Sequence, residues 1–186
     1  MKLLIMGPPG VGKGTQAKII KDKLQIAHIS TGELLRQEIA EKTEVGKVAK
    51  KYIDQGKLVP DNFLFTIVNE RLGQPDCKDG YILDGFPRTI NQANGLETIM
   101  GSFDHSLDRA ISLYADEDAL VKRLVKRGEN SGRSDDTSNI IRNRQKIYWQ
   151  QTAPLLDFYE ERGLLDNVNG LGEIKEITER ILTVIK

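Results

Sequence analysis

KLLIMGPPGVGKGTQAK, residues 2–18, is the stretch of sequence that decides the fold. Its apolar run, closely spaced glycines, lysine and helical pattern follow the order of a strand, a phosphate-binding loop and a helix. In such loops Ser or Thr normally follows the lysine, and its hydroxyl reaches Mg²⁺. Here Gly14 follows Lys13, and Thr15 comes one position late. The order therefore predicts that Mg²⁺ is held mainly by phosphates and water, with Asp84 nearby at the end of a later strand.

Backbone N–H groups in a loop of this kind converge on anions at the start of the helix. Lys13 adds a positive charge near the β and γ phosphates of a nucleotide, and Thr15 adds a hydroxyl. The alternative is an ordinary glycine-rich turn that carries a surface lysine. The residues expected to surround the phosphates are Gly10, Val11, Gly12, Lys13, Gly14 and Thr15.

Length and charge fit one soluble domain. The chain has 186 residues, 39% of them apolar, and its 27 basic residues balance its 27 acidic ones. A neutral protein has no general attraction for nucleic acid or for an anionic membrane, so we expect neither as a partner. Any anionic ligand must be met by basic residues that gather locally. No long apolar patch or heptad pattern indicates a second subunit, so a monomer is expected.

Cysteine content and apolar run lengths indicate a reducing compartment. Cys77 is the only cysteine, so neither an intrachain disulfide nor a structural zinc cage is expected. The apolar start is too short for the core of a signal peptide, and no run approaches the length of a membrane span. These features predict a cytoplasmic protein that contains no zinc.

Short apolar runs alternate with longer stretches of helical periodicity, which predicts an α/β fold with a parallel sheet. Five runs are strand candidates: residues 2–6, 26–30, 81–86, 110–115 and 164–168. Two segments interrupt the alternation. Residues 31–59 indicate two amphipathic helices with no strand between them, and residues 127–138, RGENSGRSDDTS, have the composition of a mobile loop.

Two further motifs follow predicted strands. STGELLR (30–36) contains Thr31 and Arg36, and DGFPRTINQ (84–92) sets Gln92 four residues after Arg88. Ligands of open α/β sheets bind at the carboxyl ends of strands, so one crevice can contain both motifs. Each motif also has an ordinary interpretation. Thr31 can be a helix cap, Arg36 and Gln92 can be exposed, and DGFPR can be a plain turn.

The third motif is a run of arginines towards the end of the chain. Arg123 and Arg127 lie four residues apart, so they share one helix face. Further arginines follow at positions 133, 142 and 144. A solvated basic face is the ordinary interpretation of such a run.

GPPGVGKGT resembles the nucleoside monophosphate kinases, in which GKGT replaces the usual GK[ST]. The remaining motifs resemble adenylate kinases with a short lid, in order and along essentially the whole chain. In that family TGE with a downstream Arg, GKLV, and DGFPR with its following Gln line the AMP site. The resemblance implies an AMP site formed by Thr31, Arg36, Lys57, Leu58, Val59, Gly85, Phe86, Pro87, Arg88, Gln92, Arg133 and Arg144.

The same resemblance implies roles for the arginines and for one late glycine. Arg123 would cover the ATP base, Arg127 would contact ATP phosphates, and Arg133 and Arg144 would reach the transferring and AMP phosphates. VNGLG, ending in Gly172, resembles the backbone contact to adenine. The expected catalytic set is Lys13, Arg88, Arg127, Arg133 and Arg144.

The resemblance implies a P-loop kinase whose five-stranded parallel sheet is flanked by helices. One domain spans 1–186, with a core of 1–29, 60–125 and 137–186, a flap of 30–59 that binds the nucleoside monophosphate, and a short lid of 126–136. The long lid that carries zinc in many bacterial relatives is absent. Ser134 stands where short-lid members often have an apolar residue, which leaves the packing of the lid open.

The implied activity is reversible phosphoryl transfer from ATP to AMP, giving two ADP, with Mg²⁺ as cofactor and nucleotides as the only partners. Phosphoryl transfer needs alignment and charge compensation more than a catalytic base, and clustered arginines suit that requirement. Two alternatives remain at this point. One is a UMP/CMP kinase of the same fold, and the other is a non-catalytic protein that senses ATP through the loop. Thr31 and Gln92 favour AMP over the pyrimidine nucleotides.

Overall fold

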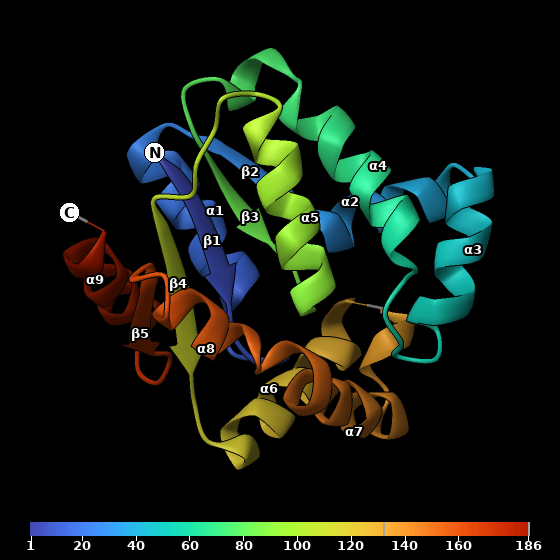
Figure 1. Cartoon of the computed structure of the whole chain (residues 1–186). Coiled ribbons are helices and arrows are strands. Elements are labelled where there is room, and N and C mark those ends of the chain that lie inside the picture. The colour runs from blue at the N-terminus through green and yellow to red at the C-terminus, as the bar shows by residue number, and fades with distance from the viewer. Residues whose placement is uncertain (132, 186) are drawn as a thin grey trace.

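A computed structural model describes residues 1–131 and 133–185 of the chain, and a five-stranded parallel sheet lies at its centre (Figure 1). The strand order is β2-β3-β1-β4-β5, and all neighbouring strands pair in parallel. The strands are β1 (Lys2–Met6), β2 (Ala27–Ser30), β3 (Tyr81–Asp84), β4 (Arg109–Tyr114) and β5 (Leu165–Asn169). The predicted α/β fold and its five strands are confirmed, with small shifts at the strand ends.

Helices fill the connections between the strands. The α-helices are α1 (Lys13–Leu24), α2 (Thr31–Ala40), α3 (Glu44–Ile53), α4 (Asp61–Leu72), α5 (Ile90–Gly101), α6 (Glu117–Ser131), α7 (Ser138–Ile147), α8 (Leu155–Glu160) and α9 (Ile174–Val184). Single turns of 3₁₀-helix are η1 (Pro75–Cys77) and η2 (Ser134–Asp136), and a π-helical turn, η3 (Tyr148–Thr152), follows α7.

The two faces of the sheet carry separate apolar clusters, because successive residues of a strand point to opposite faces. Leu3 and Ile5 of β1 pack in a cluster with α1 and α9. Leu4 and Met6 pack in the other cluster with α4, α5 and α8. Strand β1 is buried on both sides, so the loop that follows it leaves the sheet from a rigid position.

Residues 31–59 form the two expected helices, α2 and α3, with no strand between them. Ser30 caps α2, because its Oγ accepts a hydrogen bond from Glu33 N (3.4 Å). The interpretation of Thr31 as the helix cap is therefore wrong. Leu35 and Ala49 are buried in the same apolar cluster as β1, which seats both helices against the rest of the molecule.

The lid segment differs from expectation. Residues 127–138 were expected to form a mobile loop, but α6 continues to Ser131, and η2 and the start of α7 follow. Gly132, inside the expected lid of 126–136, lies outside the described residues. The helix persists because charged groups pair within the segment: Arg127 Nε lies 2.6 Å from Asp136 Oδ2. The sequence of this segment suggests charged side chains that face solvent, but in the structure Arg127 and Asp136 pair with each other.

Ser134, the unusual residue of the lid, has a partner in the flap. Its Oγ donates a hydrogen bond to Asp54 Oδ1 at the end of α3 (2.7 Å). Asn143 Nδ2 of α7 donates to the neighbouring Gln55 O (2.7 Å). The lid and the helix that follows it therefore contact the C-terminal end of α3 in the flap.

Cys77 lies in η1, which connects α4 to β3. It is fully buried, and burial raises the pKa of its thiol to about 11. Across residues 1–131 and 133–185, no helix combines the length and the apolar character that crossing a membrane requires.

Candidate active site

The predicted site residues meet at the carboxyl edge of the sheet. A cavity of about 570 Å³ opens there between the loop after β1, the start of α2, the end of β3 and the arginines of α6 and α7. It is lined by most of the predicted residues: Gly10, Val11, Gly12, Lys13, Gly14, Thr15, Thr31, Arg36, Lys57, Leu58, Val59, Asp84, Gly85, Arg88, Arg123, Arg127, Arg133, Arg144 and Gly172. Phe86, Pro87 and Gln92 are not among the described residues that line it.

Lys13 lies at the base of the cavity, with its side chain turned along the loop. Its Nζ donates hydrogen bonds to Gly7 O (2.7 Å) and Pro8 O (3.1 Å). Burial lowers its pKa to about 7, and the charges of Arg88 and Arg144 act in the same direction. A group in this setting gains strongly from an anion, because the anion removes the repulsion between the cations.

Other side chains hold further carbonyl groups of the same loop. Gln145 Nε2 of α7 donates to Pro9 O (3.1 Å), and Arg123 Nη1 of α6 donates to Val11 O (3.4 Å). The loop is therefore fixed from outside by the two helices that also carry the arginines. Gln145 was not predicted as a site residue, because its contact joins positions that are far apart in sequence.

Gly14, the unusual residue of the loop, faces a carboxylate. A Cβ atom at this position would lie 3.3 Å from Asp84 Oδ2, closer than an ordinary contact. The His28 imidazole, with Nε2 3.7 Å from the same oxygen, and the charges of Lys13 and Arg88 hold the pKa of Asp84 below its ordinary value, although burial alone would raise it. The absent side chain at position 14 thus leaves room for a buried, ionised Asp84.

An ionised carboxylate such as Asp84 is a suitable group to meet Mg²⁺. The described residues contain no group of three or more His, Cys, Asp or Glu side chains that could hold a metal ion. Mg²⁺ usually keeps several waters and binds through one or two carboxylates together with substrate phosphates. A single ionised Asp84 beside a phosphate-binding loop is sufficient for that mode of binding.

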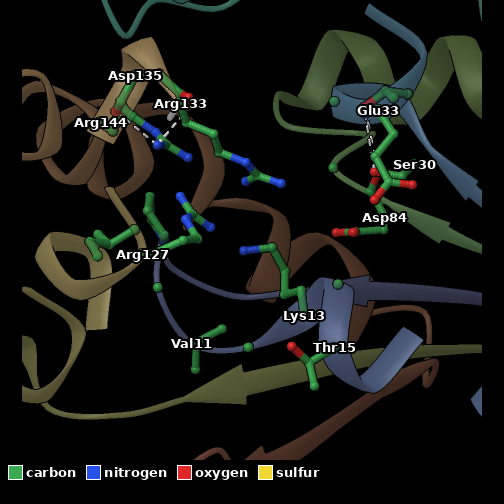
Figure 2. Close-up of a pocket in the computed structure, with 18 of the residues that line it drawn as sticks. Val11, Lys13, Thr15, Ser30, Glu33, Asp84, Arg127, Arg133, Asp135 and Arg144 are labelled. Carbon is green, nitrogen blue, oxygen red and sulfur yellow. Dashed lines mark hydrogen bonds and ion pairs between the residues drawn. The ribbon is translucent and has the colours of Figure 1, made fainter. Parts of the chain in front are cut away.

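Opposite the loop, two aspartates hold Arg127 and Arg144 in place; Figure 2 shows Asp135 beside Arg144. Asp136 accepts two hydrogen bonds of 2.6 Å from Arg127 and one of 2.7 Å from Arg144 Nη1. Asp135 Oδ2 lies 2.8 Å from the same Arg144 nitrogen. Figure 2 shows the charged ends of Lys13, Arg127 and Arg133 directed towards one central space. Two acidic groups therefore hold in place a cluster whose cations would otherwise repel one another.

Burial has the largest effect on the pKa values of Arg36 and Arg88. It lowers the pKa of Arg36, with the Arg133 charge acting in the same direction, and it lowers the pKa of Arg88, with Arg144 acting similarly. Thr31 lies beside them and donates a long hydrogen bond to Asp84 O (3.5 Å). Arg36 is half-buried and lines the cavity, so its guanidinium group lies at the candidate site.

Gln92 lies behind Arg88 and is completely buried. Its Oε1 accepts a hydrogen bond from Arg88 N, and its Nε2 donates to Asp61 Oδ1, both at 2.7 Å. Thr152 Oγ1 of η3 donates to Arg88 O (2.8 Å), so the backbone of Arg88 is held on both sides. The interpretation of Gln92 as an exposed residue is wrong. Its partner Asp61 lies 31 positions away, and no local sequence pattern marks the pair.

A phosphate-binding loop at the carboxyl edge of a parallel sheet, with clustered arginines opposite, defines a P-loop protein that binds nucleotides. The family profile described as adenylate kinase matches residues 5–164. The chain belongs to the adenylate kinase family. Full-length similarity supports the assignment: an adenylate kinase of Stenotrophomonas maltophilia (strain K279a) is 48% identical over 186 residues, covering 100% of both chains.

Other bacterial relatives are equally similar. An adenylate kinase of Bifidobacterium longum (strain NCC 2705) is 49% identical over 183 residues, 98% of each chain. One of Leptospira biflexa (strain Patoc 1 / Ames) is 48% identical over 184 residues, 99% of each chain. The similarity therefore covers the lid and the flap as well as the core.

Proposed function

We propose that this chain catalyses reversible phosphoryl transfer from ATP to AMP, giving two ADP. The observation that carries the proposal is one continuous cavity that joins a phosphate-binding loop to a second basic region at Arg36 and Arg88. A protein that only sensed ATP would have no use for that second region.

One half of the cavity suits ATP. The loop from Gly10 to Thr15 surrounds the ATP phosphates. Arg123 and Gly172 line the same half of the cavity, where the ATP base would lie. Arg127 extends this half towards the centre. A triphosphate bound here brings its terminal phosphoryl group towards Lys13.

The other half suits AMP. We assign to the AMP site the lining residues Thr31, Arg36, Lys57, Leu58, Val59, Gly85, Arg88, Arg133 and Arg144, together with Phe86, Pro87 and Gln92, which are not among the described residues that line the cavity. Arg36 and Arg88 receive the monophosphate, since guanidinium groups bind phosphate oxygens in pairs. Gln92 is fully buried and is not among the described residues that line the cavity, so its Nε2 would have to leave Asp61 Oδ1 to read the adenine edge when AMP binds.

The chemistry is alignment and charge compensation. Two polyanions repel each other, and Lys13, Arg88, Arg127, Arg133 and Arg144 offset that repulsion where the phosphoryl group moves. Asp135 and Asp136 keep Arg127 and Arg144 ordered before substrates arrive, so less reorganisation is needed in the transition state. Closure of the flap and lid excludes water, the competing acceptor.

The family uses Mg²⁺ together with ATP. When bound, the ion would neutralise charge on the ATP phosphates, and Asp84 would meet it through water. We further infer that the protein contains no zinc, acts as a monomer in the cytoplasm, and binds neither nucleic acid nor membrane.

The decisive experiment is a steady-state assay of ADP formation from ATP plus AMP, with each nucleotide alone as a control. ADP is expected only when both are present, and AMP is expected to be preferred over UMP and CMP. ATP binding without any transfer would overturn the proposal in favour of a sensor. A preference for UMP or CMP would overturn the choice of acceptor.

A further inference from the structure

A turn joins β5 to α9 (Figure 1), and Gly172 of this turn lines the cavity. The neighbouring N–H groups all have acceptors: Gly170 N donates to Tyr114 O (2.8 Å), Leu171 N to Asn169 Oδ1 (2.9 Å), and Glu173 N to Glu176 Oε2 (3.0 Å). A backbone N–H group has one proton, so these paired groups have none left to donate to a ligand.

The neighbouring carbonyl groups are held by two arginines. Arg180 Nη1 donates to both Asn169 O (2.9 Å) and Leu171 O (2.6 Å), and Arg123 Nη1 donates to Gly170 O (3.1 Å). Gly172 is different. Within residues 1–131 and 133–185, neither its N–H nor its C=O has a hydrogen-bond partner. The turn therefore presents one free donor and one free acceptor, both on the same residue.

The outer side of Gly172 is closed by Arg180 and Glu176. A Cβ atom at position 172 would lie 2.5 Å from Glu176 Oε2 and 3.4 Å from Arg180 Nη2, and the backbone has φ +112°. Only glycine fits there without strain. Arg180 is not among the described residues that line the cavity, so it acts on the site through the backbone of the turn.

We propose that Arg180 is a positioning residue that sets the base preference of the ATP half of the site; this rests on the proposed function. By holding Asn169 O and Leu171 O, Arg180 leaves the Gly172 carbonyl as the free acceptor of the turn. That acceptor suits a purine with a 6-amino group, which donates a hydrogen bond. Adenine also carries an acceptor, N1, beside its amino group, which suits the free Gly172 N–H. A 6-oxo purine in the same orientation sets an acceptor against the carbonyl and a donor against the N–H, and both pairs repel. Without Arg180, Asn169 O and Leu171 O lose their donor and the turn loses a support, so the site should no longer distinguish a 6-amino purine from a 6-oxo purine.

The test compares Arg180→Met with Arg162→Met. Arg162 is a matched control, because it is similarly exposed (37% against 41%) and also donates to a backbone carbonyl, Phe158 O (3.0 Å), but lies outside the cavity. For each protein, kcat and KM are measured with ATP and GTP as donors and AMP as acceptor.

Arg180→Met is expected to raise KM for ATP about tenfold and to lower the ATP-over-GTP ratio of kcat/KM by about tenfold. KM for AMP should stay within about twofold, and Arg162→Met should match the wild type in every constant. Arg180→Lys should be intermediate, because an ammonium group keeps the charge but does not reproduce the planar guanidinium that holds both carbonyls.

Three results would overturn the inference: an unchanged KM for ATP, equal increases in KM for ATP and AMP, or a lower melting temperature with an unchanged ATP-over-GTP ratio. If Arg180→Met fails to fold, Arg180→Lys decides by the same criteria. A wild type that makes no ADP from ATP plus AMP contradicts the proposed function instead. In that case calorimetric binding of ATP and GTP to the wild type and to both Arg180 variants tests the turn directly.

Discussion

Lys13 combines two properties at the scale of a single residue. It is bonded to carbonyl groups of its own loop, and burial lowers its pKa to about 7. Arriving phosphates would draw the ammonium group away from Gly7 O and Pro8 O and favour its charged form. The side chain therefore contributes most when the substrate is present and little to the fold without it.

Replacing Lys13 with Met tests whether the residue contributes to catalysis and not to the stability of the fold. We expect kcat to fall by about a hundredfold to a thousandfold, because the missing charge acts on the transferring phosphoryl group. The melting temperature should change little. Lys23→Met, at an exposed position of the same helix, is the control and should keep full activity. A folded Lys13→Met protein with normal turnover would show that the loop does not bind reacting phosphates.

Gln92 is the second residue whose position bears on specificity. Its amide connects Arg88 N to Asp61, so it can support Arg88, read the adenine base, or do both. The two roles differ in their dependence on the base. Support of Arg88 affects every nucleoside monophosphate equally, whereas reading of the base affects AMP most.

Gln92→Ala is expected to lower kcat/KM with AMP by about tenfold to a hundredfold, with KM for ATP nearly unchanged, because a buried polar contact is lost on the acceptor side. The assay uses AMP, UMP and CMP with both proteins. Asn91→Ala is the control, since Asn91 also donates to Asp61 but is exposed. Equal losses for all three acceptors would limit Gln92 to the support of Arg88.

At the scale of elements, the lid depends on a buried acidic group. The side chain of Asp136 is 0% exposed, and the guanidinium groups of Arg127 and Arg144 hold its pKa below the ordinary value, although burial alone would raise it. A lowered pKa means that this group stabilises the folded protein above its unfolded-state pKa. That contribution is lost as the pH falls through the folded-state pKa.

Asp136→Asn should therefore reduce the free energy of unfolding by about 2 to 4 kcal/mol at pH 7, because two arginines lose their charged partner. The difference from the wild type should narrow as the pH falls below about 4, where the Asp136 carboxyl of the unfolded chain begins to protonate, and should vanish once the pH passes the lower folded-state pKa. Urea unfolding from pH 7 to pH 3 measures both effects. Asp118→Asn, exposed on α6, should follow the wild type throughout. A constant difference across that range would contradict the assigned pKa direction.

The sequence predicted the secondary-structure elements better than it predicted the side-chain contacts between distant residues. The strands and the paired flap helices followed from periodicity, which depends on local sequence. The helix through residues 127–131 was missed, because its stability comes from the pairing of Arg127 with Asp136 and not from an apolar face. Gln92 with Asp61, and Gln145 with Pro9, were missed for a related reason. Each contact joins distant positions, and no local pattern marks a buried amide.

At the scale of the whole molecule, the phosphate loop and the arginine-rich acceptor region face one cavity. A compound that joins two adenosines through a polyphosphate should fill both halves. Once one end is bound, the second contact becomes intramolecular, so such a compound should bind far more tightly than ATP or AMP. Inhibition kinetics should show competition with both substrates. Displacement of ATP that leaves AMP binding unaffected would mean that the two sites do not face each other.

The solitary thiol of Cys77 has a practical consequence for observing the flap and lid. A buried thiol with a pKa raised to about 11 stays protonated at neutral pH and reacts slowly with alkylating reagents. The folded wild type should take up no maleimide at pH 7, and the unfolded chain should take up one. The natural sequence is thus ready for site-specific labelling. Cysteines introduced on α3 and α6 can carry a fluorescent pair that reports the flap-to-lid distance, with Cys77 left in place.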